Sequence, residues 1–84
     1  MTDQEIRNAI LETAYKVWKE KRKIPFPLFE ESKDWGVEEK DLKRSLDYLV
    51  QKGWMEIPGY KADRPLVRIT VAGVDEYERM HKDS

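Results

Sequence analysis

The chain has 84 residues, 39% of them hydrophobic and 39% charged, which suits one small domain with a modest core beneath a highly charged surface. Its 16 lysines and arginines and 17 aspartates and glutamates give a net charge of −1, which argues against a strong, indiscriminate nucleic-acid binder. With no cysteine and a single histidine, His81, neither a disulfide framework, nor a zinc site, nor a histidine-based hydrolytic triad can be assembled.

The segment Thr2-Asp-Gln-Glu5 predicts the start of a first helix, because Thr2 and Glu5 can form a reciprocal capping box. This helix should end within residues 19–23, since Ile24-Pro25-Phe26-Pro27 cannot continue it. Two apolar strips run along the helix, so both of its sides need cover. The first strip is Ile6, Ala9, Ile10, Thr13, Ala14 and Val17, and the second is Leu11, Tyr15 and Trp18.

The second strip, Leu11, Tyr15 and Trp18, allows two interpretations. It could be the surface for a protein partner or for a weak homodimer. Alternatively, the chain's own hairpin or last helix covers it, and the first helix is then buried on both sides within a monomer. We favour cover by the chain itself.

Residues 24–26 are short and bounded by proline, which indicates an edge strand or an extended linker. A second helix is predicted with Pro27 at its first position and its end near Asp34, buried through Leu28 and Phe29. Gly36 is a suitable left-handed stop, after which the chain turns directly into a third helix. This is a helix-turn-helix arrangement.

The third predicted helix, residues 38–52, has the clearest amphipathic pattern of the chain. Glu38 stands at its cap and Lys52-Gly53 closes it. Its buried stripe is expected to contain Leu42, Leu46, Leu49, Val50 and Gly53. Its opposite side carries Lys40, Asp41, Arg44, Tyr48 and Gln51, of which we expect Tyr48 to pack under the second helix.

After Gly53 the pattern changes to two extended segments, residues 54–57 and 66–69, which predict a hairpin with a long loop over residues 58–65. Lys61 and Arg64 lie in this loop. Thr70 should cap a last helix, whose apolar side is expected to be Val71, Val74 and Tyr77, and residues 81–84 should fray. The expected fold class is mainly α with a small β-hairpin (α+β), in a single domain over residues 1–84.

Two motifs in this order resemble the winged helix-turn-helix family: Leu42-x-x-x-Leu46-x-x-Leu49-x-x-x-Gly53-Trp54-Met55 and Ile69-Thr70-x-x-Gly73. The resemblance covers nearly the whole chain. It implies the order helix, short strand, helix, helix, strand, strand, helix. It also implies binding of double-stranded DNA, with the third helix in the major groove and the wing near the backbone or minor groove. Carried onto this sequence, it places Lys40, Lys43, Arg44, Lys61 and Arg64 against DNA.

The start of the third helix departs from that pattern, because it offers Glu38, Glu39 and Asp41, which phosphates repel. For Lys40, Lys43 and Arg44 the alternative is a solvated helix face with local ion pairs. Two functions therefore stay open. The first is a regulator that binds duplex DNA through helix 38–52 and the 58–65 wing, and the second is a protein-interaction module on the same scaffold without DNA binding.

Other function classes find no support in the sequence. No glycine-rich phosphate loop is present, and the carboxylate pairs Glu30-Glu31 and Glu38-Glu39 point in different directions around a helix. No apolar run could span a bilayer, and the acidic start lacks the basic and apolar regions of a secretory signal. We expect a cytoplasmic protein that is not an enzyme, uses no cofactor or metal and has no membrane partner.

Overall fold

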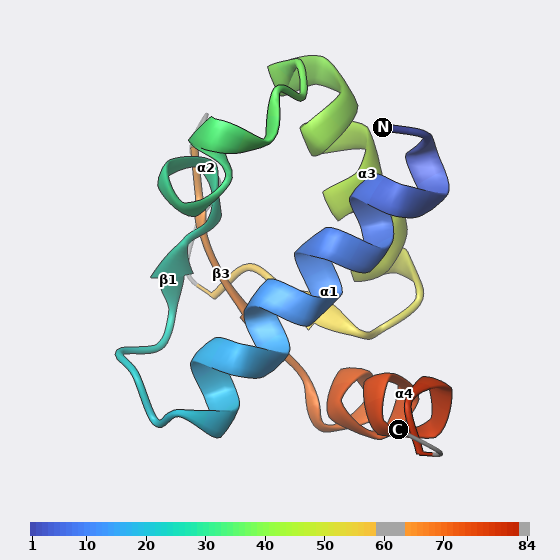
Figure 1. The fold of residues 1–84 in the computed structure, drawn as a ribbon. Coiled ribbons are helices and arrows are strands. Elements are labelled where there is room, and N and C mark those ends of the chain that lie inside the picture. Colours follow the sequence, from blue (N-terminus) through green and yellow to red (C-terminus); the bar gives the residue numbers. More distant parts are fainter. Residues whose placement is uncertain (59–63, 83–84) are drawn as a thin grey trace.

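Helix α1 crosses the middle of the computed structural model, which describes residues 1–58 and 64–82 (Figure 1). Within these residues the architecture is mainly helical with a small three-stranded antiparallel sheet, as expected for the α+β class. The elements are α1 (Asp3–Lys19), β1 (Phe26–Pro27), α2 (Leu28–Glu31), the 3₁₀ helix η1 (Lys33–Trp35), α3 (Glu39–Gln51), β2 (Met55–Glu56), β3 (Leu66–Ile69) and α4 (Val71–Met80).

The predicted capping box opens α1. The hydroxyl of Thr2 accepts from the backbone N–H of Glu5 at 3.2 Å, and the Glu5 carboxylate accepts from the backbone N–H of Thr2 at 2.8 Å. Both predicted apolar strips contribute to the core, since Ile10 on one strip and Leu11 on the other are each at most 2% exposed. Helix α1 contacts α3, β3 and α4, which together cover it on more than one side.

The second helix is shorter than the sequence predicted. Pro27 does not occupy the first helical position but precedes α2 as its N-cap, with extended backbone angles (φ −83°, ψ 92°). This conformation lets Pro27 belong to β1, where it pairs with Leu66 of β3. The remainder of the predicted helix becomes η1, which ends at Gly36 in the left-handed conformation that was expected (φ 72°).

Strand β3 is the centre of the sheet, with β1 and β2 on its two sides. Phe26 of β1 lies opposite Val67, and Met55 of β2 lies opposite Ile69. A third strand, β1, is therefore added to the expected hairpin of residues 54–57 and 66–69. Of the two predictions for residues 24–26, an edge strand or an extended linker, the structure has an edge strand that begins at Phe26. An edge position suits Pro27, because proline has no N–H to donate to a second neighbour.

The turn after α3 is bonded directly to the start of α4. The backbone N–H of Thr70 donates to the carbonyl of Trp54 at 3.0 Å. The Thr70 hydroxyl donates to the carbonyl of Gly53 at 2.5 Å and accepts from the N–H of Gly73 at 3.0 Å, which makes it the N-cap of α4. A Cβ on Gly73 would lie 2.1 Å from the Trp54 carbonyl oxygen, so this close approach requires glycine.

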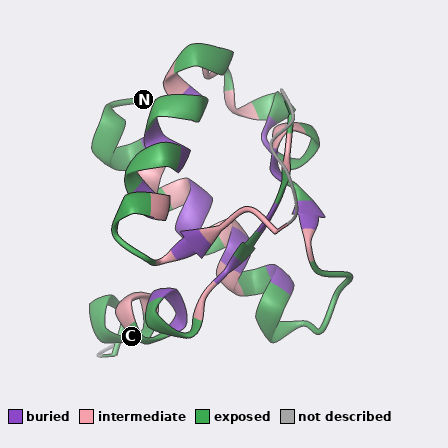
Figure 2. Cartoon of the chain, turned by 180° about the vertical axis from the view of Figure 1, so that it is seen from behind, coloured by how far each residue is buried: buried purple, intermediate pink, exposed green. Residues whose placement is uncertain are grey.

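The buried residues line the inward sides of the helices and the central strand, while the outward sides are exposed (Figure 2). On α3 the predicted stripe is confirmed for Leu42, Leu46 and Leu49, and Ser45, which the sequence did not indicate, is also buried. The apolar side predicted for the last helix is wrong for Val71, which is 79% exposed. It lies in the first turn of α4, whose buried residues are Gly73 and Val74.

Replacing Leu46 with alanine should lower the free energy of unfolding by roughly 2–5 kcal/mol, because the 2% exposed side chain would leave a cavity. Lys43→Ala, on the exposed side of the same helix, is the matched control and should change it by less than about 0.5 kcal/mol. Urea denaturation of both variants checks the difference, and equal losses would show that the orientation of α3 is wrong.

Gly73→Ala should destabilise the fold by roughly 1–3 kcal/mol or more, because the new Cβ meets the rigid backbone of Trp54. Gly36→Ala is the comparison variant. It has no atom within 4 Å of the added Cβ and should cost only the roughly 1 kcal/mol of placing alanine at positive φ. Thermal unfolding ranks the two, and a smaller loss for Gly73→Ala would contradict the close contact between α4 and the turn after α3.

Candidate functional site

Helix α3 buries one side, through Leu42, Ser45, Leu46 and Leu49, and leaves its outer side exposed. Glu38 is the N-cap, as predicted, but its side chain makes no capping hydrogen bond. The acidic residues Glu39 and Asp41 occupy the first turn, where the helix dipole favours negative charge. At the other end Gly53 adopts positive φ (80°) and leads the chain into β2.

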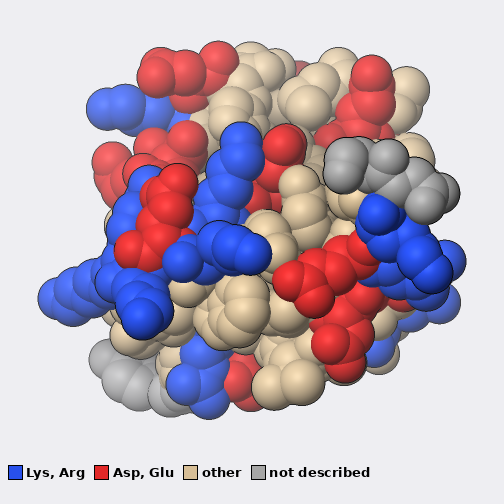
Figure 3. Space-filling model, turned by 60° about the horizontal axis from the view of Figure 1, so that its bottom comes forward, with Lys and Arg blue, Asp and Glu red and all other residues tan. Residues whose placement is uncertain are grey.

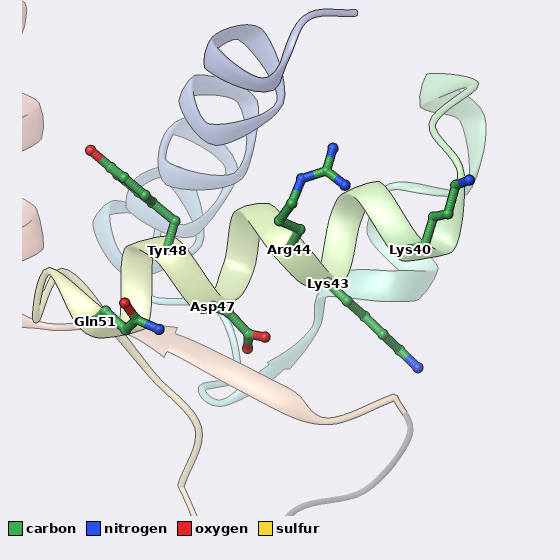
Figure 4. Close-up of a pocket in the computed structure, with 6 residues that line it drawn as sticks. All are labelled: Lys40, Lys43, Arg44, Asp47, Tyr48 and Gln51. Atoms are coloured by element: carbon green, nitrogen blue, oxygen red, sulfur yellow. The ribbon is translucent and has the colours of Figure 1, made fainter.

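The outer side of α3 carries a shallow hollow, shown in Figure 4 and called the α3 face below. Arg44 and Tyr48 project on the side of α3 nearer to α1, whereas Lys43 and Asp47 project on the opposite side (Figure 4). The structure thus brings together the three helical residues that the sequence predicted for DNA contact. The residues of the α3 face are Lys40, Lys43, Arg44, Asp47, Tyr48 and Gln51.

Arg44 is held by two carboxylates. Its Nη2 lies 2.8 Å from Oδ1 of Asp3, at the start of α1, and 2.9 Å from Oδ1 of Asp41, one turn earlier on α3. The hydrogen bond from Arg44 is the main reason that the pKa of Asp3 lies below its ordinary value. The same bond, with a second that Arg44 donates to Asp41, raises the pKa of Arg44 above its ordinary value.

Two other cations that the sequence predicted for DNA contact also form ion pairs with carboxylates. Lys40 lies 3.5 Å from the carboxylate of Glu38, and Arg64 lies 3.2 Å from that of Glu39. Among the residues that the structure describes, Lys43 makes no ion pair. Lys61 lies outside the described residues. The cations on and beside the α3 face therefore lie among carboxylates and, in the described residues, do not form a continuous positive strip.

The same mixture of charges is seen elsewhere on the molecule. On the side shown in Figure 3, lysine and arginine side chains lie next to aspartate and glutamate, with uncharged surface between them. This pattern agrees with the near-neutral net charge and gives the visible surface no extended region of one sign.

Tyr48 is the exposed aromatic residue of the α3 face, at 40% exposure. It does not pack under α2 as the sequence suggested. The guanidinium of Arg7, on α1, lies 4.2 Å from the centre of its ring, and Lys52 lies 5.7 Å from it on the same helix. The packing of α1 against α3 brings Arg7 to this ring, a contact that the sequence did not predict.

The strip Leu11, Tyr15 and Trp18 is mostly covered by the chain itself. Leu11 is 2% exposed, and the ring of Tyr15 stacks on Tyr77 of α4 at 4.3 Å. The Tyr15 hydroxyl donates to Glu78 at 2.7 Å, and this bond raises its pKa. Trp18 is the exception, with 42% of its surface exposed. Of the three residues that the sequence offered as a partner or dimer surface, Trp18 alone is classed as exposed.

Asp3 contacts the α3 face through Arg44, and the sequence did not indicate this contact. Asp3 belongs to the segment that predicts the start of the first helix, and Arg44 stands 41 positions later in the chain. No local spacing links the two, so only a prediction of how α1 packs on α3 could have found the pair.

Within residues 1–58 and 64–82, no group of three or more histidine, cysteine, aspartate or glutamate side chains is placed to hold a metal ion. In the same residues, every helix is too short or too polar to cross a bilayer.

Comparison with known proteins gives no match: no protein-family model, no curated protein and no solved structure matches the chain.

The ion pair between Asp3 and Arg44 can be tested through its effect on acid titration. Because Asp3 has a lowered pKa in the folded state, the pair stabilises the fold at pH values above the ordinary aspartate pKa of about 3.9. That stabilisation is lost as the pH falls through the lowered value. Carboxyl-detected NMR should find the pKa of Asp3 below the ordinary value in the parent protein and near it in Arg44→Ala. An unshifted pKa in both proteins would show that the pair is not formed in solution.

Proposed function

We propose that the chain is a winged helix-turn-helix domain, in which α2 and α3 form the helix-turn-helix and β2 and β3 the wing. The order of the elements and the antiparallel sheet order β1-β3-β2 support this proposal. The left-handed Gly36 between η1 and α3 and the glycine-dependent entry to α4 support it as well.

We further propose that this domain binds duplex DNA through α3 and the wing, as a regulator. The observation that carries the proposal is the exposed side of α3, along which Lys40, Lys43 and Arg44 line one shallow hollow. An α-helix with its side chains is about 10–12 Å in diameter and the major groove of B-DNA is about 12 Å wide, so the 13-residue helix α3 can lie in the groove. Lysine would contact phosphates, and Arg44 would offer two parallel donors to a guanine edge.

The wing adds a second set of contacts in this proposal. Arg64, in the predicted loop of residues 58–65, lies at the edge of α3 through its pair with Glu39, and Lys61 belongs to the same loop in the sequence. A domain with a net charge of −1 would bind weakly as one reading head, so two copies on neighbouring half-sites are the expected binding form.

A protein-interaction module on the same scaffold is the second candidate, and the composition of the α3 face favours it. Lys40 and Arg44 on this face, and Arg64 beside it, are already paired with carboxylates. Tyr48 stands exposed with Arg7 and Lys52 near its ring, and tyrosine and arginine are both enriched at energetically important interface positions. A pull-down in which both DNA and protein are identified, repeated with Tyr48→Ala, separates the two functions.

The DNA-binding proposal predicts a steep salt dependence. In titrations of a fluorescent random-sequence duplex, log Kd should change linearly with log salt concentration because phosphate contacts release counterions. Lys43→Ala and Arg64→Ala should each lower the magnitude of that slope by about 0.9. The matched control is Lys23→Ala, in the turn after α1, which should leave the slope unchanged.

Two results would count against DNA binding by this face. Slopes that fall equally for Lys43→Ala and Lys23→Ala would mean that the contact is diffuse and not made by α3. Absence of binding by the parent protein at low salt would reject the DNA-binding function and leave the protein-interaction module.

A further inference from the structure

Arg44 is unusual on the α3 face because one of its nitrogens serves two acceptors. Nη2 donates to Asp3 at 2.8 Å and to Asp41 at 2.9 Å. A guanidinium can offer two forks of parallel donors, Nε with Nη2 or Nη1 with Nη2, and each fork needs one hydrogen of Nη2. With both hydrogens of Nη2 engaged by carboxylates, neither fork is free to contact a base edge.

The two carboxylates are held in place by different parts of the fold. Asp41 lies three residues before Arg44 on the same helix, so it accompanies Arg44 wherever α3 goes. Asp3 comes from α1, where the capping box formed by Thr2 and Glu5 fixes the first turn. Contact between Asp3 and Arg44 therefore depends on how α1 packs against α3.

The local charge also opposes DNA. One guanidinium between two carboxylates leaves a net negative group at the middle of a face that would have to approach phosphates. The side chains of Asp3 and Arg44 are 52% and 57% exposed, so their bond is accessible to solvent and can be exchanged for a contact with a ligand.

We propose that Asp3 is an intramolecular competitor of DNA for Arg44: while Asp3 is bound, Arg44 cannot make a bidentate contact with guanine. This inference rests on the proposed DNA-binding function. Asp3 is a positioning residue in this scheme, since it acts through Arg44. Release of Asp3 alone frees one fork, and Asp41 can continue to orient the guanidinium from within α3.

The direct test is Asp3→Asn, which removes the charge and keeps the shape of the side chain. Binding is measured by fluorescence anisotropy with two labelled duplexes, one of random sequence and one selected from a random pool by the parent protein. Affinity for the random duplex should rise roughly twofold, because one repelling charge is lost. Affinity for the selected duplex should rise about fivefold or more, because Arg44 then has to leave only an uncharged amide oxygen, a weaker acceptor than a carboxylate, before it contacts the base.

Two further variants separate this mechanism from a general effect of charge. Glu12→Gln makes the same charge change on the exposed side of α1, where Glu12 pairs with Lys16, and should change the affinity for the two duplexes by the same factor. Asp3→Asn in an Arg44→Ala background should give about the same small gain with both duplexes. Thermal unfolding of each variant shows whether the fold is kept.

The inference is overturned if Asp3→Asn has the same effect with and without Arg44, because Asp3 would then act only as a charge. It is also overturned if the parent protein binds DNA and Asp3→Asn binds both duplexes no better. A different result, no binding by the parent or any variant while NMR finds the lowered pKa of Asp3, would confirm the ion pair. That result would reject the proposed DNA-binding function, and the competition with it.

Discussion

The burial of α1 on more than one side is the constraint on which the rest of this structure depends. One helix contributes Ile6, Ile10, Leu11, Ala14 and Val17 to the core and contacts α3, β3 and α4. A domain of this size can bury only a small core. A helix that is apolar on two sides lets elements on both of its sides pack against the same few buried side chains. Each neighbour of α1 then fixes the position of the others.

The second constraint lies where the turn after α3 meets the start of α4. Thr70 joins the two through its backbone and its hydroxyl, and Gly73 allows the Trp54 carbonyl to come close. Helix α4 is thereby placed so that Tyr77 stacks on Tyr15 of α1. The same junction ends α3 and begins the strand pair, so it links the orientation of the exposed α3 face to the packing of the far helix.

The charges of the α3 face bear on function more than on stability. Exposed ion pairs such as those of Arg44 and Arg64 contribute little to folding, because solvent screens them and long side chains must be ordered to form them. They nevertheless determine what the face presents to a partner. In the proposed DNA complex, Arg44 held by Asp3 and Asp41 would be a weaker contact than a free arginine. In the proposed protein-interaction module, Tyr48 beside Arg7 would be the protein contact. Function is a property of the site and not of the fold, so the side chains on this surface are what would distinguish the two proposals.

The sequence by itself determined the elements, their order and most of the core, because caps, glycine stops and apolar spacing act over a few residues. It predicted the capping box at Thr2, the stop at Gly36 and the stripe of Leu42, Leu46 and Leu49 correctly. It overestimated α2 because pairing with β3 holds Pro27 in an extended conformation. Only the tertiary structure decided that Asp3 contacts Arg44 and that the guanidinium of Arg7 lies over the ring of Tyr48. It also decided that Trp18 is exposed while Tyr15 stacks on Tyr77. These contacts depend on the positions at which α1 crosses α3 and α4, and no pattern within a single helix records where another helix will cross it.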